Sequence, residues 1–409
     1  CMTTQDVLLL ENIHTEAETP LTGSDLSVSR HDGALSGDDL ADALRGSRFL
    51  GIRSKTQITS AVLAASPSLE AIGCFCIGTN QVAIEEAARR GIAVFNSPFS
   101  NTRSVAEMTI AEIIVLHRRL FDRSMGLHQG RWEKSASGAH EVRGRTLGIV
   151  GYGHIGSQVS VLAEAIGMRV VYFDIAPRMA LGNAEPCKSL EELLQRADVV
   201  TLHVPATATT RHMVGGAQLA AMKRDATLIN NARGSVVDLD ALAEAIRNET
   251  IGGTALDVYP AEPKSNKDAF DCPLAGLPNV IMTPHIGGST EEAQAQIAAD
   301  VGQKLARYAD TGTTTSAVNV PEVDLPSHDP AHVRVLHFHR NVPGVLSALH
   351  AMIAEAQANI HAEYLQSLGD VSYVILDIDP VNIDLLQGHI QNMDETIRLR
   401  ILAGQTPAG

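Results

Sequence analysis

The sequence predicts an α/β fold, in which a doubly wound parallel sheet is followed by a smaller C-terminal unit. Short apolar runs alternate with helix-like stretches over most of the chain, and this alternation is typical of parallel sheets. A glycine-rich turn separates two of the apolar runs, and the residues after 332 follow a βαββαβ order. The 409 residues suffice for two or three domains at roughly 150 residues each.

The first part of the chain carries apolar runs that are bounded by helical patterns. A helix at Gln81–Arg90 ends at Gly91, and a longer one covers Val105–Leu120 and connects two lobes. The buried strands that we expect here are Asp6–Leu10, Phe49–Ile52, Ala71–Ile77 and Ile92–Phe95.

The alternation restarts after residue 145 and predicts a sheet of the Rossmann type. Ser189 with Glu192 forms a capping box, Asp238 caps the next helix, and Ser289 with Glu292 opens a long helix that runs to about residue 308. The six expected strands are Thr146–Val150, Arg169–Phe173, Asp198–Val204, Ala226–Asn230, Gly253–Val258 and Asn279–Thr283.

The C-terminal part begins after a linker, residues 311–330, which is rich in Thr, Ser, Pro and Asp. Strands are expected at Val333–His339 and Val371–Asp379, with a helix at Gly344–Gln357 between them. Residues 360–364 and 397–401 alternate in polarity, which predicts two more strands whose polar face, with Arg398 and Arg400, meets solvent. This order is that of a ferredoxin-like unit.

The composition excludes several classes of protein. With 32 basic and 47 acidic residues the net charge is −15, and such a surface repels nucleic acid and anionic membranes. No apolar stretch reaches the roughly 18 residues that a membrane span needs. Five cysteines without CxxC spacing favour reduced thiols and a cytoplasmic location.

A dinucleotide-binding loop is predicted at residues 151–156. Gly151 permits the tight turn, Gly153 lets the backbone approach a pyrophosphate, and Gly156 lets the helix pack on the strand. Asp174 ends the next strand, where its carboxylate can accept bonds from a ribose, so NAD is favoured over NADP, although Arg178 is close in sequence. The alternative interpretation is an ordinary tight turn with an acid at a strand end.

Three further polar residues follow the ends of predicted strands, where open α/β sheets bind their ligands. Arg233 offers a planar fork that can hold a carboxylate, and His285 can accept or return a hydroxyl proton near neutral pH. Glu262 beside the histidine would favour the imidazolium. Each residue alone has an ordinary structural explanation; together, after a dinucleotide loop, they predict hydride transfer involving a 2-hydroxy acid.

These motifs resemble the D-isomer-specific 2-hydroxyacid dehydrogenase family, and within it the serine-inhibited branch that oxidises 3-phosphoglycerate. The segments that carry the resemblance are residues 52–56, 74–82, 99–107, 151–156, 231–234, 255–263 and 283–290.

The resemblance implies a discontinuous, flavodoxin-like substrate domain at 2–100 and 286–320. It further implies an inserted NAD-binding Rossmann domain at 101–285, a linker at 321–331 and an ACT regulatory domain at 332–409.

The resemblance also implies roles for individual residues. His285 would be the acid and base, Glu262 its partner and Arg233 the anchor of the carboxylate. Contacts to NAD are implied for His154, Ile155, Asp174, Asn231, Ala232, Arg233 and Asp257. Substrate contacts are implied for Arg53, Ser54 and Asn101, and for Trp132 and Lys134 from a neighbouring subunit of a homotetramer. Arg53, Lys55 and Lys134 are the candidates for a phosphate.

The C-terminal unit resembles an ACT domain, in which the residues matching His339, Asn341 and Asn359 bind L-serine where two such domains pair. The related enzymes carry a Gly-Gly hinge before this domain, whereas this chain has Pro330 there, which stiffens the joint. A metal site is the rival interpretation, since His337 and His339 share a strand face and His328, His332, His350 and His361 are near in sequence. No cysteine or acid has zinc spacing, so we expect no metal.

The sequence is therefore compatible with three functions. The first is oxidation of 3-phospho-D-glycerate to 3-phosphohydroxypyruvate with NAD, the first step of serine synthesis, with serine as the effector. The second is the same chemistry on another 2-hydroxy acid, including reduction of 2-oxoglutarate. The third is an NAD-sensing binding protein without turnover.

Overall fold

The computed structural model describes residues 5–263 and 268–403, so the outermost residues of the predicted first and last domains lie outside the described part. The chain divides into two compact units, Cys1–Ser100 with Gln294–Gly409, and Asn101–Ala293. No helix in the described ranges has the length and apolar character that crossing a membrane requires.

The first unit contains a five-stranded parallel sheet of order β2-β1-β3-β4-β5, which is the flavodoxin-like order. The long helix α11 and the strands of this sheet enclose a core with Phe49, Phe95, Val301 and Tyr308. The elements of this part are β1 Val7–Leu9, α1 Glu18–Gly23, β2 Val28–Arg30, α2 Gly37–Ala43, β3 Phe49–Ile52, α3 Ser60–Ala65, β4 Ala71–Cys74, α4 Ile84–Arg89, β5 Ala93–Asn96 and α11 Glu291–Thr311.

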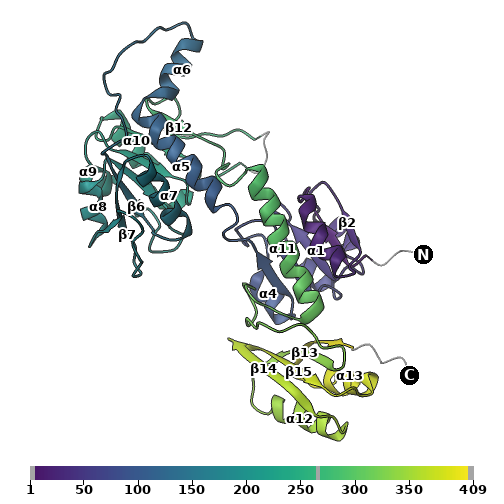
Figure 1. Cartoon of the computed structure of the whole chain (residues 1–409). Coiled ribbons are helices and arrows are strands. Elements are labelled where there is room, and N and C mark those ends of the chain that lie inside the picture. Colours follow the sequence, from purple (N-terminus) through teal and green to yellow (C-terminus); the bar gives the residue numbers. More distant parts are fainter. Residues whose placement is uncertain (1–4, 264–267, 404–409) are drawn as a thin grey trace. The chain divides into compact units, whose positions relative to one another are not determined.

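The second unit contains a seven-stranded parallel sheet of order β12-β11-β10-β9-β6-β7-β8, the doubly wound order expected for nucleotide binding, with helices on both faces (Figure 1). Its elements are α5 Thr102–His117, α6 Leu120–His128, β6 Thr146–Val150, α7 His154–Ala165, β7 Arg169–Phe173, β8 Glu185–Pro186, α8 Leu190–Arg196, β9 Val199–Leu202, α9 Gly216–Ala221, β10 Thr227–Asn230, α10 Leu239–Arg247, β11 Gly253–Leu256 and β12 Val280–Met282.

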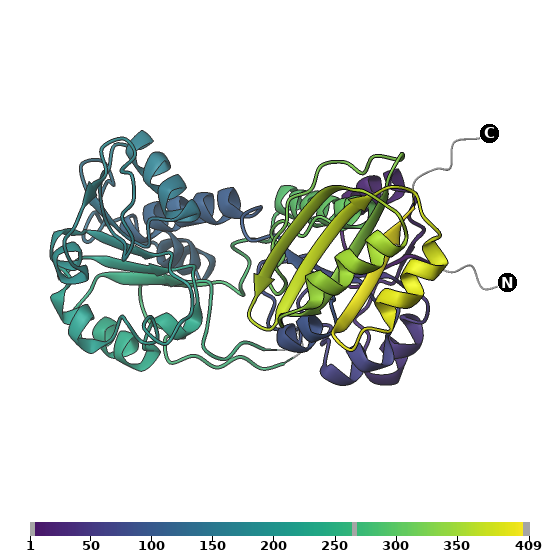
Figure 2. The same cartoon turned by 90° about the horizontal axis from the view of Figure 1, so that it is seen from below.

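The C-terminal residues of the first unit form a four-stranded antiparallel sheet of order β14-β15-β13-β16. Helices α12 and α13 cover one face of this sheet (Figure 2), which confirms the predicted βαββαβ arrangement. The elements are β13 Val333–Arg340, α12 Val345–Glu355, β14 Ile360–Leu368, β15 Val371–Ile378, α13 Ile383–Gln391 and β16 Thr396–Leu402.

Strand β14 is largely exposed, as expected, but the face of β16 that carries the arginines is packed against another part of the first unit, which corrects the expectation of a solvated arginine face. Arg400 has only 9% of its side chain exposed and bonds Glu70 at 2.9 Å, and its guanidinium lies 4.7 Å from the ring centroid of Tyr308. Arg398 donates to the carbonyl of Arg90. The alternating pattern identified the strand correctly, but polarity alone could not distinguish a solvated face from one that is buried by ion pairing with another part of the chain.

Two local expectations also need correction. The predicted helix at Val105–Leu120 is interrupted, because Arg119 adopts a left-handed conformation between α5 and α6. The cap of α11 is Thr290, whose Oγ1 accepts from the amide of Ala293, in place of Ser289. The caps at Ser189 and Asp238 are confirmed by hydrogen bonds to amides of the following turn.

Candidate active site

The glycine loop between β6 and α7 has the geometry of a dinucleotide cradle. Gly151 has φ +92°, and a Cβ there would lie 2.4 Å from the carbonyl oxygen of His203. A Cβ on Gly156 would lie 2.2 Å from the carbonyl oxygen of Gly151, whereas the space beside Gly153 is open. Gly153 is also the N-cap of α7, whose first amides can face an anion. His154 and Ile155 are the first two residues of this helix.

Asp174 closes this cradle at the end of β7. Its carboxylate accepts from the amides of Tyr152 and Ala176, both at 2.9 Å, and from Arg178 at 3.2 Å. Partial burial alone would raise the pKa of Asp174, but these hydrogen bonds and the arginine charge outweigh that effect and lower it. The acid is therefore ionised, as ribose recognition requires, and Arg178 is engaged by it.

The arginine loop and the glutamate loop are brought together by Gly234. A Cβ at this position would lie 2.0 Å from the carbonyl carbon of Tyr259, so only glycine lets the segment after β10 pack on the segment after β11. Arg233 is exposed and extended, with one guanidinium nitrogen 2.7 Å from the carbonyl of Ala232. Its guanidinium makes no other hydrogen bond within the described part of the chain, so the remaining donors can hold a carboxylate.

His285 and Glu262 form the predicted pair. The Nδ1 atom of His285 lies 2.8 Å from Oε2 and 3.1 Å from Oε1 of Glu262. The glutamate also accepts from the amide of Tyr259 at 3.1 Å. Because Nδ1 is engaged, Nε2 is the nitrogen that can exchange a proton with a substrate.

Asp257 holds the histidine loop in place. This residue is 2% exposed, and its carboxylate accepts from Thr283 Oγ1 at 2.6 Å and from the amides of Ile286 and Gly287 at 2.8 and 2.7 Å. His285 itself has φ +55°, an unfavourable conformation for a non-glycine residue that the surrounding bonds must support. Sequence reasoning assigned Asp257 an NAD contact and missed this supporting role.

Asn231 is buried and turned toward α5. Its amide nitrogen donates to Glu112 Oε2 at 2.7 Å and to Thr109 Oγ1 at 3.1 Å. Glu112 was not among the predicted residues. Its contact with Asn231 spans 119 positions, so no local sequence motif indicates it. Ala232 is also buried.

The remaining predicted substrate residues occupy different environments. Arg53 and Ser54 follow β3 in the first unit, where Arg53 is half-buried and Ser54 is exposed. Asn101 is the buried N-cap of α5, and its Oδ1 has no hydrogen-bond partner among the described residues. Trp132 is 80% exposed, and Lys134 is exposed nearby.

The predicted effector residues lie at the ends of β13 and β14. His339 is 3% exposed, its Nδ1 bonds the carbonyl of Arg340, and its Nε2 has no partner within the described ranges. Burial lowers the pKa of His339, so it is neutral near pH 7. Asn341 bonds the carbonyl of Gly369, and the amide of Asn359 bonds Asp379.

The histidines do not assemble into a metal centre. The rings of His337 and His339 lie 5.2 Å apart, and burial, followed by the neighbouring His339, lowers the pKa of His337 to about 3. Over the described residues, no group of three or more His, Cys, Asp or Glu side chains could hold a metal ion.

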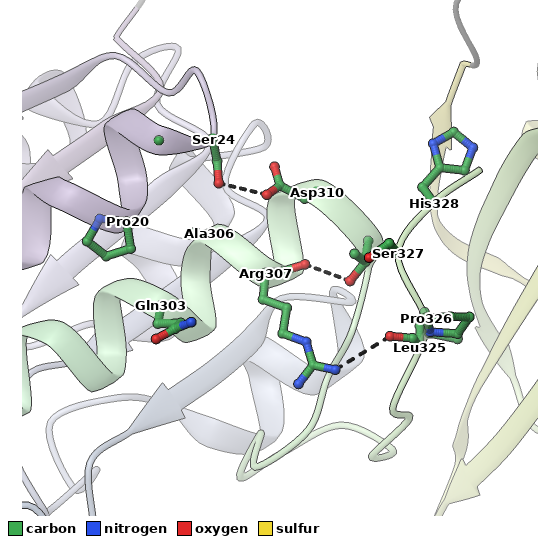
Figure 3. Close-up of a pocket in the computed structure, with 12 residues that line it drawn as sticks. Pro20, Ser24, Gln303, Ala306, Arg307, Asp310, Leu325, Pro326, Ser327 and His328 are labelled. Carbon is green, nitrogen blue, oxygen red and sulfur yellow. Dashed lines mark hydrogen bonds between the residues drawn. The ribbon is translucent and has the colours of Figure 1, made fainter. Parts of the chain in front are cut away.

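A cavity of about 940 Å³ in the first unit is a separate feature. It lies between α1, α11 and the segment that follows Leu325 (Figure 3), and none of the predicted site residues lines it. Arg307 on its wall is engaged by Asp324 and by the carbonyl of Leu325.

Known proteins share both the motifs and the fold. The family model "D-isomer specific 2-hydroxyacid dehydrogenase, NAD binding domain" matches residues 110–287, and the model "AHAS small subunit-like ACT domain" matches residues 335–398.

Two full-length relatives carry the same name. D-3-phosphoglycerate dehydrogenase of Haemophilus influenzae is 47% identical over 97% of this chain and 96% of its own length, and the enzyme of that name from Escherichia coli is 46% identical over 97% of both chains.

Solved structures agree with this relationship. The TT0316 protein of Thermus thermophilus has a TM-score of 0.66 at 34% identity, over 74% of this chain and 96% of its own. D-lactate dehydrogenase of Aquifex aeolicus, complexed with NAD and lactic acid, has a TM-score of 0.63 at 28% identity, over 74% of this chain and 95% of its own. The chain belongs to the D-isomer specific 2-hydroxyacid dehydrogenase family and carries its NAD-binding domain together with an ACT-type domain.

Proposed function

We propose that the chain oxidises 3-phospho-D-glycerate to 3-phosphohydroxypyruvate with NAD, the first step of L-serine synthesis. The observation that carries this proposal is the His285–Glu262 pair, held beside the Arg233 loop by the close approach of Gly234 to Tyr259. The full-length relatives named for this activity favour it over both alternatives.

Each residue of the candidate site has a separate role in the proposed reaction. The loop at residues 151–156 and Asp174 would hold NAD, which would supply a hydride acceptor for C2 of the substrate. Arg233 holds the carboxylate by two charge-assisted bonds and so orients C2. His285 Nε2 takes the hydroxyl proton as the C2–H bond breaks, and Glu262 stabilises the resulting imidazolium across the Nδ1 contact. Arg53, Lys55 and Lys134 are the candidates for the positive charge that binds the phosphate.

A spectrophotometric assay tests this activity. Wild-type protein with 3-phospho-D-glycerate and NAD should generate NADH, and His285→Ala should lose about 10²- to 10⁴-fold in rate, the usual contribution of a general acid and base. A panel that includes 2-oxoglutarate tests the substrate assignment. If the protein binds NAD but turns over none of these substrates, it is an NAD-sensing binding protein and not a dehydrogenase.

We also infer that the functional form is a homotetramer in the cytoplasm. Helix α6 and the segment after it expose apolar side chains, including Phe121, Leu127 and Trp132, and such a patch is typical of an interface. Trp132 and Lys134 would then contribute to a neighbouring subunit's site. The cysteines within the described ranges are free thiols, which suits a reducing compartment. Sedimentation tests the assembly.

L-serine is the effector that we propose for the C-terminal unit. His339 has an Nε2 atom without a hydrogen-bond partner among the described residues, Asn341 follows it two positions later, and Gly344 before α12 has a left-handed conformation. Calorimetry should detect serine binding to wild-type protein, and His339→Ala should abolish it. Pro330 stiffens the joint before this unit, so binding and inhibition must be measured separately.

A further inference from the structure

Glu11 lies immediately beyond β1, at the carboxyl end of a parallel strand where ligand sites form. It is 8% exposed and has φ +61°, a left-handed conformation that a non-glycine residue rarely adopts. Such conformations persist where the surrounding structure requires them. The buried carboxylate and the left-handed backbone of Glu11 therefore indicate a role other than filling the core.

The carboxylate of Glu11 accepts hydrogen bonds from three backbone amides of a single loop. Oε1 accepts from Arg53 at 3.2 Å and from Thr56 at 2.8 Å, and Oε2 accepts from Lys55 at 3.0 Å. Hydrogen bonds to an ionised acceptor are stronger than neutral ones. One buried charge therefore determines the shape of residues 53–56, which follow β3.

The same loop is held from its other side by Gln81. Its Nε2 donates to the carbonyl of Arg53 at 2.7 Å and to that of Gly78 at 3.2 Å. Both peptide groups that flank the Cα of Arg53 are thus fixed, one by Glu11 and one by Gln81. Fixing both peptide planes sets φ and ψ of Arg53 and hence the direction of its Cα–Cβ bond.

We propose that Glu11 is a positioning residue that gives the enzyme its selectivity for a phosphorylated substrate, by fixing the backbone from which the Arg53 side chain projects. This inference rests on the proposed function and on its assignment of Arg53 to the phosphate of the substrate. A carboxylate that holds only the backbone leaves the charge of Arg53 available to the substrate.

The test compares two keto acids that differ only in the phosphate group, 3-phosphohydroxypyruvate and hydroxypyruvate, in the NADH-oxidising direction. Glu11→Gln keeps the size of the side chain but removes the charge. The ratio of kcat/KM for the phosphorylated over the unphosphorylated acid should fall about tenfold or more, the usual consequence of a misplaced contact. The KM for NADH should stay within about twofold, since Glu11 lies outside the nucleotide loop.

Asp6→Asn is the matched control. Asp6 precedes β1 at its opposite end, and its carboxylate also accepts a backbone amide, that of Ser27, at 3.0 Å. This variant should lower stability while leaving the selectivity ratio unchanged. Glu11→Asp, which retains the charge on a shorter side chain, serves if Glu11→Gln does not fold, and should give a smaller loss of selectivity.

Amide hydrogen exchange of residues 53–56 provides a readout that does not depend on turnover. Exchange should be faster in Glu11→Gln than in wild type and unchanged in Asp6→Asn. Equal losses of activity on both keto acids, or unchanged exchange, would overturn the role of Glu11 while the proposed function stands. A wild-type protein inactive on 3-phosphohydroxypyruvate would overturn the proposed function itself, and the inference with it.

Discussion

The side-chain amide of Asn231 donates a 2.7 Å hydrogen bond to the carboxyl group of Glu112, which is 5% exposed on α5. Burial raises the pKa of Glu112 to about 7; the bond from Asn231 opposes this rise, and the charge of Asp257 adds to it. The other oxygen, Oε1, has no partner among the described residues. The segment that carries Arg233 is therefore anchored to a group that titrates near neutral pH.

Replacing Glu112 by Gln should remove a pH-dependent loss of stability. A carboxyl whose folded pKa is raised stays protonated in the folded protein while the unfolded chain releases its proton, so stability falls as the pH rises from about 4.5 to about 7. Relative to wild type, Glu112→Gln should gain about 2 kcal/mol between pH 5 and pH 8. Thermal unfolding of both proteins at the two pH values measures this difference; a constant offset in Tm would exclude the titration of Glu112.

Glu262→Gln should reduce turnover without preventing NAD binding. The amide can still accept from the backbone of Tyr259, but it cannot stabilise an imidazolium at His285. We expect kcat to fall about 10²-fold, with an unchanged dissociation constant for NADH in a fluorescence titration. A loss of NADH affinity as large as the loss of kcat would show that the glutamate supports the fold of the site more than its chemistry.

Gly234→Ala should separate the arginine loop from the glutamate loop. The added Cβ would lie 2.0 Å from the carbonyl carbon of Tyr259, so one backbone must move. We expect activity to fall at least tenfold, together with a lower Tm. Gly216→Ala in α9 is the control, since nothing lies within 4 Å of its Cβ, and it should keep full activity. A fully active Gly234→Ala protein would contradict the packing described here.

Arg400→Met should loosen the C-terminal sheet from the rest of its unit. It leaves the carboxylate of Glu70, which Arg48 also contacts at 2.9 Å, with one fewer cation, and breaking such a buried pair costs about 3–5 kcal/mol. Limited proteolysis near Pro330 should become faster. Arg45→Met removes an exposed pair with Asp42 and should cost under about 1 kcal/mol; equal effects of the two changes would contradict the burial of Arg400.

Strands with buried faces could be predicted from the sequence alone. The expected limits of β3, β6 and β7 coincide with those of the structure, because continuous apolar runs determine these strands locally. The edge strands β2 and β8 were not predicted. Strand β2 is short and mostly half-buried, and β8 is short and exposed. Both form by pairing with a neighbouring strand, so no continuous apolar run marks them in the sequence.

Part of the candidate site could also be predicted from the sequence, because some of its residues lie in local motifs. The dinucleotide loop and His285 each lie in a short sequence motif, and such a motif indicates the function of its residues without any distant contact. Glu11, which holds the Arg53 loop, and Glu112, which anchors Asn231, make contacts 45 and 119 positions away. Each is a single acidic residue within a turn or a helix, so no local motif marks it. A carboxylate directly after a predicted parallel strand was the available signal for Glu11.

In the proposed reaction, hydride leaves C2 of the substrate for NAD while His285 takes the hydroxyl proton. Wild-type enzyme supplied with 3-phospho-D-glycerate deuterated at C2 should yield NADH that carries one deuterium, as measured by mass spectrometry, and His285→Ala should form this product at least about 10²-fold more slowly. NADH without deuterium, or an unaffected His285→Ala variant, would contradict the account.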